Sequence, residues 1–234
     1  MFRFKRFTIH DDRCAMKVGT DGVLLGCWAA LPIQGQGLAL DVGAGSGLIA
    51  LILAQRYPTL QITALEIDPS AADQAAENVV ASPFAAQVEV VCGDFLHHPL
   101  TPQSVAAIMS NPPYFEEDLL APNPQRAQAR HATAGLTFEA LIARSAELLQ
   151  QGGSLQVVLP TTAQSRFHTI CNQHGLNLVR ETKVQTTPSK PPKRVLLHFE
   201  KAVNTPPVQR DTLSLMLNGQ RSPAYTALCA DFYL

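Results

Sequence analysis

The 234-residue sequence predicts an α/β domain with a doubly wound, mostly parallel sheet of seven strands and an antiparallel hairpin at one edge. Short apolar runs alternate with helical patterns over residues 37–175, at a spacing typical of right-handed crossovers between parallel strands. A glycine-rich turn separates the first apolar run from the helix that follows it. Residues 176–184 and 194–201 look like two strands with no helix between them, which favours the edge hairpin.

The elements follow from these patterns in chain order. A short helix after a Thr or Asp cap is expected over residues 20–31, and residues 37–57 are expected to form strand, turn and helix. The remaining strands are expected at 61–68, 87–95, 104–109, 154–160, 176–184 and 194–201, and the remaining helices at 69–81, 136–153 and 161–175. We expect one domain over 1–234, with a short N-terminal extension (1–37) and a C-terminal tail (202–234).

Composition excludes several classes of protein. The five cysteines are scattered and form no CxxC pair, which favours a reduced, cytoplasmic protein with buried thiols. The seven histidines have no metal-ligand spacing, and we interpret His97 and His98 as loop residues, so no metal is expected. No apolar run is long enough for a signal peptide or a membrane span, so no membrane association is expected.

Charge is separated along the chain although the net charge is only −1. Residues 38–120 hold ten acidic residues and one basic residue, whereas residues 160–201 hold seven basic and two acidic residues. Residues 1–37 hold five basic and three acidic residues. The separation suggests that one half handles a cation and the other an anion. The alternative is two solvated faces of opposite charge.

The glycine-rich turn, "LDVGAGSG", places Asp41 directly before Gly43, Gly45 and Gly47. Glycines let a backbone approach a ligand closely and adopt conformations that other residues avoid. A carboxylate at this point would repel the phosphate that related turns bind, but it would attract a cation. The alternative is a tight strand-to-helix turn without a ligand.

Two further strands also end in carboxylates. Glu66 ends the second strand, where doubly wound nucleoside binders hold ribose hydroxyls, and Asp68 could assist it or cap the helix before Pro69. Asp94 follows the third strand and could accept a hydrogen bond from an adenine amine, with Phe95 packing on the ring. Three acidic strand ends at one edge of the sheet predict a pocket for a positively charged adenosine, which is S-adenosylmethionine.

The fourth strand ends in "SNPPYF", residues 110–115. Two prolines fix φ and remove two backbone donors, so rigidly held carbonyl acceptors remain. Together with the glycine-rich turn, this segment resembles the signature of class I methyltransferases that act on amino groups of adenine, guanine or glutamine side chains. The resemblance spans roughly residues 15–200 and implies a Rossmann-like fold and S-adenosylmethionine as cofactor. By itself, the segment would be a rigid turn more often than a catalytic one.

The chemistry of an adenine amine explains the residue types. Its lone pair is conjugated into the ring, so attack on a methyl group requires pyramidal geometry and a growing positive charge. The side-chain oxygen of Asn111 and the carbonyl of Pro112 can each accept one amine hydrogen and favour that state, while Pro113 keeps the turn rigid. Tyr114 can stack on the base, which is worth about 1–3 kcal/mol, and Phe115 extends the flat apolar surface beside it.

The chain resembles one small bacterial family more narrowly, the enzymes that methylate the adenine beside the anticodon of valine tRNA. The shared features are "KVGTDGVLLG" from Lys17 to Gly26 and the ending "DFYL", residues 231–234. The resemblance implies formation of N6-methyladenosine, and it implies that Lys17 and Thr20 close over the cofactor or target site. Thr20 could alternatively be a simple helix cap. Cys27 departs from the family, where a smaller residue is commoner.

Basic residues in two segments are candidates for RNA contacts. They are Lys190, Lys193 and Arg194 at a Pro-rich hairpin tip, and Arg126, Arg130 and His131 in the loop after "NPPYF". The alternative is that they are solvated surface residues. Other substrate classes also stay open: those of an amino-methyltransferase of ribosomal RNA or DNA, or of a protein-glutamine methyltransferase. An inactive module that only binds S-adenosylmethionine would be expected to lose Asn111 or an acidic strand end, and neither is lost. The 37 residues before Leu38 are too few for the helical domain that the glutamine enzymes carry there.

Overall fold

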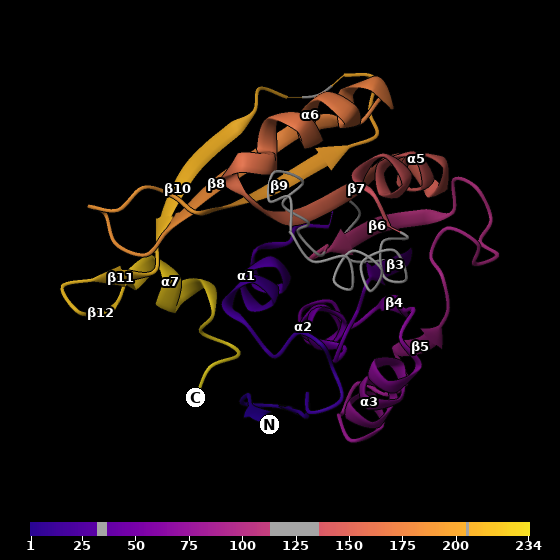
Figure 1. Ribbon diagram of the computed structural model, residues 1–234, viewed down its shortest axis with the longest axis horizontal. Helices are drawn as coiled ribbons and strands as arrows, with labels where there is room; N and C mark the ends of the chain where they lie inside the picture. Colours follow the sequence, from indigo (N-terminus) through magenta and orange to yellow (C-terminus); the bar gives the residue numbers. More distant parts are fainter. Residues whose placement is uncertain (32–36, 113–135, 205) are drawn as a thin grey trace, which may run out of the picture.

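Helices cover both faces of one mixed, mostly parallel sheet in the computed structural model, which describes residues 1–31, 37–112, 136–204 and 206–234 (Figure 1). One face carries α1 (Thr20–Trp28), α2 (Leu48–Arg56) and α3 (Pro69–Val80). The other face carries α5 (Phe138–Leu148) and α6 (Gln164–Gln173). The predicted doubly wound α/β fold is therefore confirmed.

The central sheet has eight strands among the described residues. In spatial order they are β10 (Gln209–Ser214), β8 (Asn177–Gln185), β9 (Arg194–Glu200), β7 (Leu149–Pro160), β6 (Val105–Ser110), β3 (Gly37–Val42), β4 (Leu60–Glu66) and β5 (Val88–Cys92). Strand β9 is antiparallel to both its neighbours, and the other pairs are parallel. Seven of these eight strands, all except β9, therefore point their carboxyl ends to the same edge.

Side chains alternate between two hydrophobic clusters, one on each face of the sheet. In β3, for example, Ala39 belongs to the cluster under α1 and α2, whereas Leu40 and Val42 belong to the cluster under α5 and α6. Both faces of the central strands are thus buried, which is why these strands appear as continuous apolar runs in the sequence.

The hairpin of β8 and β9 is antiparallel as predicted, but it does not lie at the edge of the sheet. Strand β10, from the predicted C-terminal tail, pairs in parallel with β8 and is the eighth strand that the described residues add to this sheet, where seven were predicted. Four of its six residues are exposed and only Leu213 is buried. Because only one residue of this strand is buried, its sequence has no alternating apolar pattern from which a strand could be predicted.

Two predicted helix boundaries are also wrong. The first helix ends at Trp28 rather than residue 31, and its N-cap is Gly19, which has no side chain to cap with. The helix predicted over 136–153 ends at Leu148, because the residues before the glycine pair already belong to β7. Pairing of Leu149 with Val105 of β6 starts that strand. A short 3₁₀ turn, Thr161–Ala163, then leads into α6.

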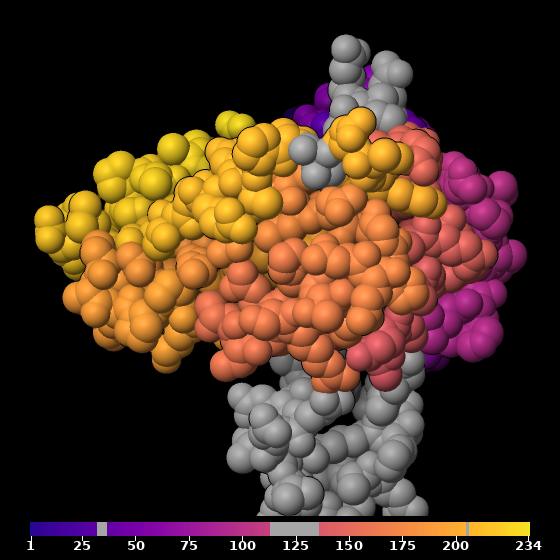
Figure 2. Space-filling model, turned by 90° about the horizontal axis from the view of Figure 1, so that it is seen from above, coloured from indigo at the N-terminus to yellow at the C-terminus, as the bar shows by residue number. Residues whose placement is uncertain are grey.

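The two ends of the chain pack against each other. The N-terminal segment forms the small hairpin of β1 (Phe2–Arg3) and β2 (Thr8–Ile9), and the C-terminal segment forms β11 (Met216–Leu217), β12 (Gln220–Arg221) and α7 (Pro223–Leu228). Lys5 joins them, since its amide donates to Phe232 O at 2.9 Å and its ammonium donates to Ala230 O at 2.6 Å. Figure 2 shows the C-terminal residues (yellow) packed beside the β8–β9 region (orange). The predicted extension and tail therefore close onto the same body.

A buried histidine predicts how stability depends on pH. Burial, and secondarily the charge of Arg180, lowers the pKa of His198 to about 4. The unfolded chain takes up this proton first, so stability is lost as pH falls from about 6.5 towards 4, by up to about 3 kcal/mol. Urea unfolding of wild type and His198→Gln between pH 7 and pH 4 should show wild type losing stability relative to the variant, since the other groups, Asp41 among them, titrate in both proteins. Parallel curves for the two proteins would contradict this role for His198.

Candidate functional site

The glycine-rich turn lies at the carboxyl edge of the sheet, between β3 and α2. Gly43 and Gly45 have φ of 73° and 55°, values that other residues rarely adopt, so glycine is needed at both positions. A Cβ atom added at either would meet no atom of the described residues within 4 Å. The amide of Gly43 donates to Leu65 O at 2.9 Å, which ties the turn to β4. Gly47 is the N-cap of α2. The turn therefore leaves open space above a rigid backbone.

Asp41, at the end of β3, is fully buried beneath this turn. Its Oδ2 accepts a hydrogen bond from Ala50 N at 3.0 Å, near the start of α2. Its Oδ1 has no hydrogen-bond partner among the described residues. Burial raises the pKa of Asp41 to about 7, against the hydrogen bond from Ala50, and the charge of Glu66 adds to the increase. A buried carboxylate with one unused oxygen favours a cationic group nearby.

Glu66, at the end of β4, joins the glycine-rich turn to the start of α3. Its Oε2 accepts from Gly45 N at 2.8 Å, and its Oε1 accepts from Asp68 N at 2.9 Å. Asp68 in turn caps α3, since its Oδ1 accepts from Ala71 N at 2.8 Å. The capping alternative for Asp68 is therefore what the structure shows, and a cofactor contact of Asp68 stays a prediction.

Asp94 and Phe95 follow β5 at the same edge. Burial would raise the pKa of Asp94, but hydrogen bonds from Leu96 N (2.9 Å) and from the ring of His97 (2.7 Å) outweigh it and lower the pKa. Asp94 is thus a carboxylate held in place beside the site. Phe95 is buried in the hydrophobic cluster on the α5–α6 side. Its ring packs in this cluster, and stacking of the ring on a bound adenine stays a prediction.

Asn111 leaves the sheet next to the glycine-rich turn. In the parallel pair of β3 and β6, Val42 lies opposite Ser110, and the Ser110 hydroxyl donates to Val42 O at 2.8 Å. The next residue of each strand, Gly43 and Asn111, therefore emerges from adjacent strand ends. Pro112, which follows, is buried. The remaining candidates of this segment lie outside the described residues: Pro113, Tyr114, Phe115, Arg126, Arg130 and His131.

Lys17 and Thr20, which are predicted to close over the cofactor or target site, both have defined local surroundings in the structure. The ammonium of Lys17 donates to three backbone carbonyls of its own segment, 2.7 to 3.2 Å away. Its charge is thus already occupied by backbone oxygens. Thr20 is the first residue of α1 and not its cap, so the capping alternative is wrong. A direct contact of either residue with a cofactor stays a prediction.

The basic hairpin tip between β8 and β9 rises at the same edge as Asn111. Arg194 lies opposite Pro160, the last residue of β7, which runs parallel to β6. Its Nε donates to Asp21 Oδ2 at 2.7 Å, so this cation binds the tip to α1. Lys190 and Lys193 are exposed beside it. Two of the three predicted RNA contacts are therefore solvent-facing, and the third also has a structural partner.

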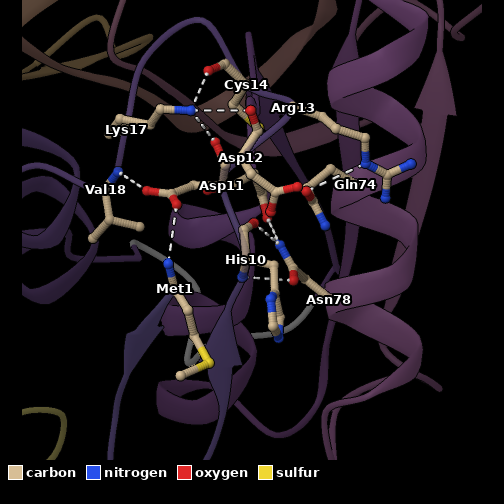
Figure 3. Close-up of polar contacts among 11 residues, drawn as sticks. Met1, His10, Asp11, Asp12, Arg13, Cys14, Lys17, Val18, Gln74 and Asn78 are labelled. Carbon is tan, nitrogen blue, oxygen red and sulfur yellow. Dashed lines mark hydrogen bonds and ion pairs between the residues drawn. The ribbon is translucent and has the colours of Figure 1, made fainter.

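One group of site residues was not predicted from the sequence. Asn78 of α3 forms two hydrogen bonds with His10, near the N-terminus (Figure 3), and a third with Ser46 of the glycine-rich turn. The signal was a polar residue on the apolar face of a helix, since Ala71, Ala75 and Val79 are its buried neighbours.

The arrangement can hold a cationic adenosine. Asp41 offers a buried carboxylate oxygen that has no partner in the part of the chain that the structure describes, and the space above Gly43 and Gly45 admits a ligand at close range. These observations fit S-adenosylmethionine, whose methionine part carries a sulfonium and an ammonium. Among the described residues, no three His, Cys, Asp or Glu side chains are grouped to hold a metal ion. Nor does the described part of the chain contain a helix long and apolar enough to span a membrane.

Comparison with known proteins gives a consistent result. Residues 22–178 match the family model of the methyltransferase small domain. The chain is 44% identical to a protein of Bacteroides thetaiotaomicron named tRNA1(Val) (adenine(37)-N6)-methyltransferase, over 100% of this chain and 97% of the relative. It is 43% identical to a protein of the same name from Erwinia tasmaniensis, over 100% of this chain and 94% of the relative.

Solved structures support the fold. A protein from Agrobacterium tumefaciens described as a predicted O-methyltransferase superposes with a TM-score of 0.71 at 19% identity, over 91% of this chain and 96% of that one. A TehB-like SAM-dependent methyltransferase from Corynebacterium glutamicum superposes with a TM-score of 0.51 at 17% identity, over 78% and 89% of the two chains.

Proposed function

Since the chain belongs to the methyltransferase small domain family, and matches bacterial tRNA1(Val) (adenine(37)-N6)-methyltransferases from end to end, we propose that it methylates N6 of the adenine beside the anticodon of valine tRNA. It is an S-adenosylmethionine-dependent enzyme, and that cofactor supplies a methyl group on a positively charged sulfur. The observation that carries the proposal is the position of Asn111 beside the glycine-rich turn, one residue after the Val42–Ser110 pair.

The cofactor is proposed to bind at the carboxyl edge of β3, β4 and β5. Asp41 attracts the positive end, the turn at Gly43 and Gly45 lets the backbone approach, and Glu66 accepts from the ribose hydroxyls. Both Glu66 oxygens accept backbone amides, and each keeps a further lone pair for a hydroxyl. Asp94, fixed by Leu96 and His97, is proposed to accept from the adenine amine of the cofactor.

The target amine is proposed to bind to Asn111 and Pro112. Their oxygens accept its two hydrogens, favour pyramidal geometry at nitrogen, and interact more strongly as positive charge develops there. Both residues follow a fully buried strand end, so they are held by the sheet rather than by a free loop. The proton leaves for water after methylation, because the methylated amine is acidic until it loses it. The protein therefore needs to align the nitrogen with the methyl group and requires no general base.

The substrate class can be tested directly. Purified enzyme is incubated with labelled S-adenosylmethionine and, separately, with total tRNA, ribosomal RNA or protein from cells that lack the gene, and labelled nucleosides are identified. Label is expected in tRNA as N6-methyladenosine, in valine tRNA and next to the anticodon. Label in ribosomal RNA or in glutamine side chains would replace the proposed substrate, and absence of any label would reject the function.

The enzyme is further proposed to act in the cytoplasm as a single domain. All five cysteines are free and four are buried, which suits a reducing compartment where tRNA is present. Lys5, near the N-terminus, bonds to Phe232, near the C-terminus, so the two described ends of the chain pack on each other, which supports one domain.

Lys190 and Lys193 are expected to contact tRNA phosphates. Replacing both with Ala should make tRNA binding less dependent on salt, because each lost phosphate contact changes the log–log slope by about 0.7–0.9. Binding is measured by filter retention at about 50 to 300 mM KCl, and the slope of log K against log salt concentration is determined. The matched control replaces Arg3 and Arg210, two exposed cations outside the site, and should keep the wild-type slope. Equal slopes for both double variants would show that the two lysines are solvated surface residues that do not contact tRNA phosphates.

A further inference from the structure

The N-terminal strap, residues 10–18, is held against the glycine-rich turn by one buried amide. Asn78, which is 2% exposed, donates from Nδ2 to His10 O at 2.7 Å and to Ser46 O at 2.9 Å. Its Oδ1 accepts from His10 N at 2.9 Å. Both donors of the side chain and its acceptor are therefore in use. Strap, α3 and glycine-rich turn meet at this single side chain (Figure 3).

The strap is closed on itself by Lys17. The ammonium donates to the carbonyls of Asp11 (2.7 Å), Asp12 (3.1 Å) and Cys14 (3.2 Å), which uses all three of its hydrogens. The carboxylate of Asp11 also accepts from Val18 N at 2.9 Å, across the same loop. These contacts give an irregular segment a defined shape without a helix or sheet, with the lysine at its centre (Figure 3).

The strap adjoins the proposed cofactor site at the glycine-rich turn, because Asn78 bonds to both His10 and Ser46. Cys14, a residue of the strap, is buried, and its pKa is raised by burial and then by the charges of Glu66, Asp11 and Asp68. Glu66 in turn accepts from Gly45 N of the glycine-rich turn. On the outer side, Arg13 pairs with Gln74 and Glu77 of α3. The strap therefore lies against α3 and beside the glycine-rich turn.

We infer that Asn78 is a positioning residue for the cofactor, which acts by holding the strap as a fixed wall of the site, with Lys17 as the second tie. The inference rests on the proposed function, since it takes the glycine-rich turn as the cofactor site. It assigns Lys17 a role inside the strap instead of a direct contact with the cofactor. Binding then requires the closed strap, and the apparent dissociation constant rises in proportion as the closed fraction falls.

Asn78→Asp tests the first tie at constant shape. A carboxylate cannot donate to His10 O or Ser46 O, so two hydrogen bonds are lost and oxygen faces oxygen. We expect the Kd for S-adenosylmethionine, measured by calorimetry, and the KM for this cofactor to rise about tenfold or more. A tenfold rise corresponds to a strap that is closed in about one tenth of the molecules. The value of kcat at saturating cofactor and the Kd for tRNA should stay within about twofold of wild type.

Lys17→Met tests the second tie and keeps the test open if Asn78→Asp folds poorly. The same rise in the cofactor Kd is expected. Trypsin should also cut after Arg13 faster than in wild type before any cofactor is added, because the strap opens. A lysine that only contacted the cofactor would weaken binding and leave this cleavage of the free protein unchanged, which would overturn its assigned role.

Ser82→Ala is the matched control, two residues after the end of the same helix. Its buried hydroxyl donates to Val79 O at 2.8 Å and accepts from Phe84 N at 3.1 Å, and neither bond involves the strap. It should lower Tm without changing the cofactor Kd or the cleavage at Arg13. Wild-type cofactor affinity in folded Asn78→Asp and Lys17→Met would refute the inference. No cofactor binding by wild type would instead refute the proposed function.

Discussion

Asn111→Ala is expected to reduce methyl transfer to tRNA by about 10²–10³-fold while leaving the affinity for S-adenosylmethionine nearly unchanged. The side-chain oxygen of Asn111 is proposed to bind the amine and not the cofactor. Its hydrogen bond strengthens as the nitrogen gains charge, so the loss should appear in kcat more than in either dissociation constant. The measurement is single-turnover methyl transfer at saturating tRNA and cofactor, with calorimetry for binding of each.

Asn177 provides the matched control for this prediction. It is an asparagine at the start of β8, at the opposite edge of the sheet, and its Nδ2 donates to Ala202 O at 2.8 Å. Asn177→Ala should cost some stability and leave turnover at the wild-type rate. If Asn111→Ala kept a tenth or more of wild-type turnover, the acceptor role would be wrong, and "SNPPYF" would be a stiff turn only. Tyr114→Ala should instead weaken tRNA binding, and Tyr114→Phe should be mild because stacking survives.

Asp41→Asn is expected to have opposite effects on cofactor affinity and on the stability of the free protein. Removing one partner of a buried charge pair costs about 2–5 kcal/mol, so the Kd for S-adenosylmethionine should rise by about thirtyfold or more. In the free protein, however, the buried carboxylate has one oxygen without a partner among the described residues. Asparagine keeps the size of the side chain and removes the charge, so unfolding should become harder.

The pH dependence of the stability difference between wild type and Asp41→Asn shows whether the charge of Asp41 is its cause. The pKa of Asp41 is about 7 in the folded protein, above its ordinary value of 3.8. Wild type is therefore penalised as pH rises from about 4 through 7, by up to about 4 kcal/mol, and Asp41→Asn is not. Urea unfolding should show the variant more stable than wild type at pH 8 and nearly equal at pH 4. Equal stability at both values would show that Asp41 is not a strained carboxylate.

Cofactor binding to wild type should depend on pH for the same reason. A cation near Asp41 favours the ionised form, so binding below pH 7 must first release a proton from this carboxyl group. The affinity is expected to fall by up to about tenfold per pH unit below 7, and the fall should be absent in Asp41→Asn. Calorimetry in two buffers of different ionisation enthalpy measures the released proton directly.

The carboxyl-edge residues could be located from the sequence because their placement needs only strand ends. Asp41, Glu66, Asp94 and Asn111 each end or follow an apolar run, and parallel strands bring such positions to one edge whatever their separation in the chain. The structure places all four there, on β3, β4, β5 and β6. The same local logic identified the glycine-rich turn, where positive φ angles demand glycine.

Other parts of the site were decided only by tertiary structure. The bond of Asn78 to His10 spans 68 residues and that of Arg194 to Asp21 spans 173, so neither has a local signal. Strand β10 is nearly all polar and becomes a strand because β8 offers it an unpaired edge. Periodicity and turn chemistry act over a few residues. They determined the alternation of strands and helices, and the carboxylates and Asn111 at the carboxyl edge of the sheet. Contacts between distant segments depend on how the packed elements meet, and they determined the strap, the pairing of Arg194 and the closure of the two ends of the chain.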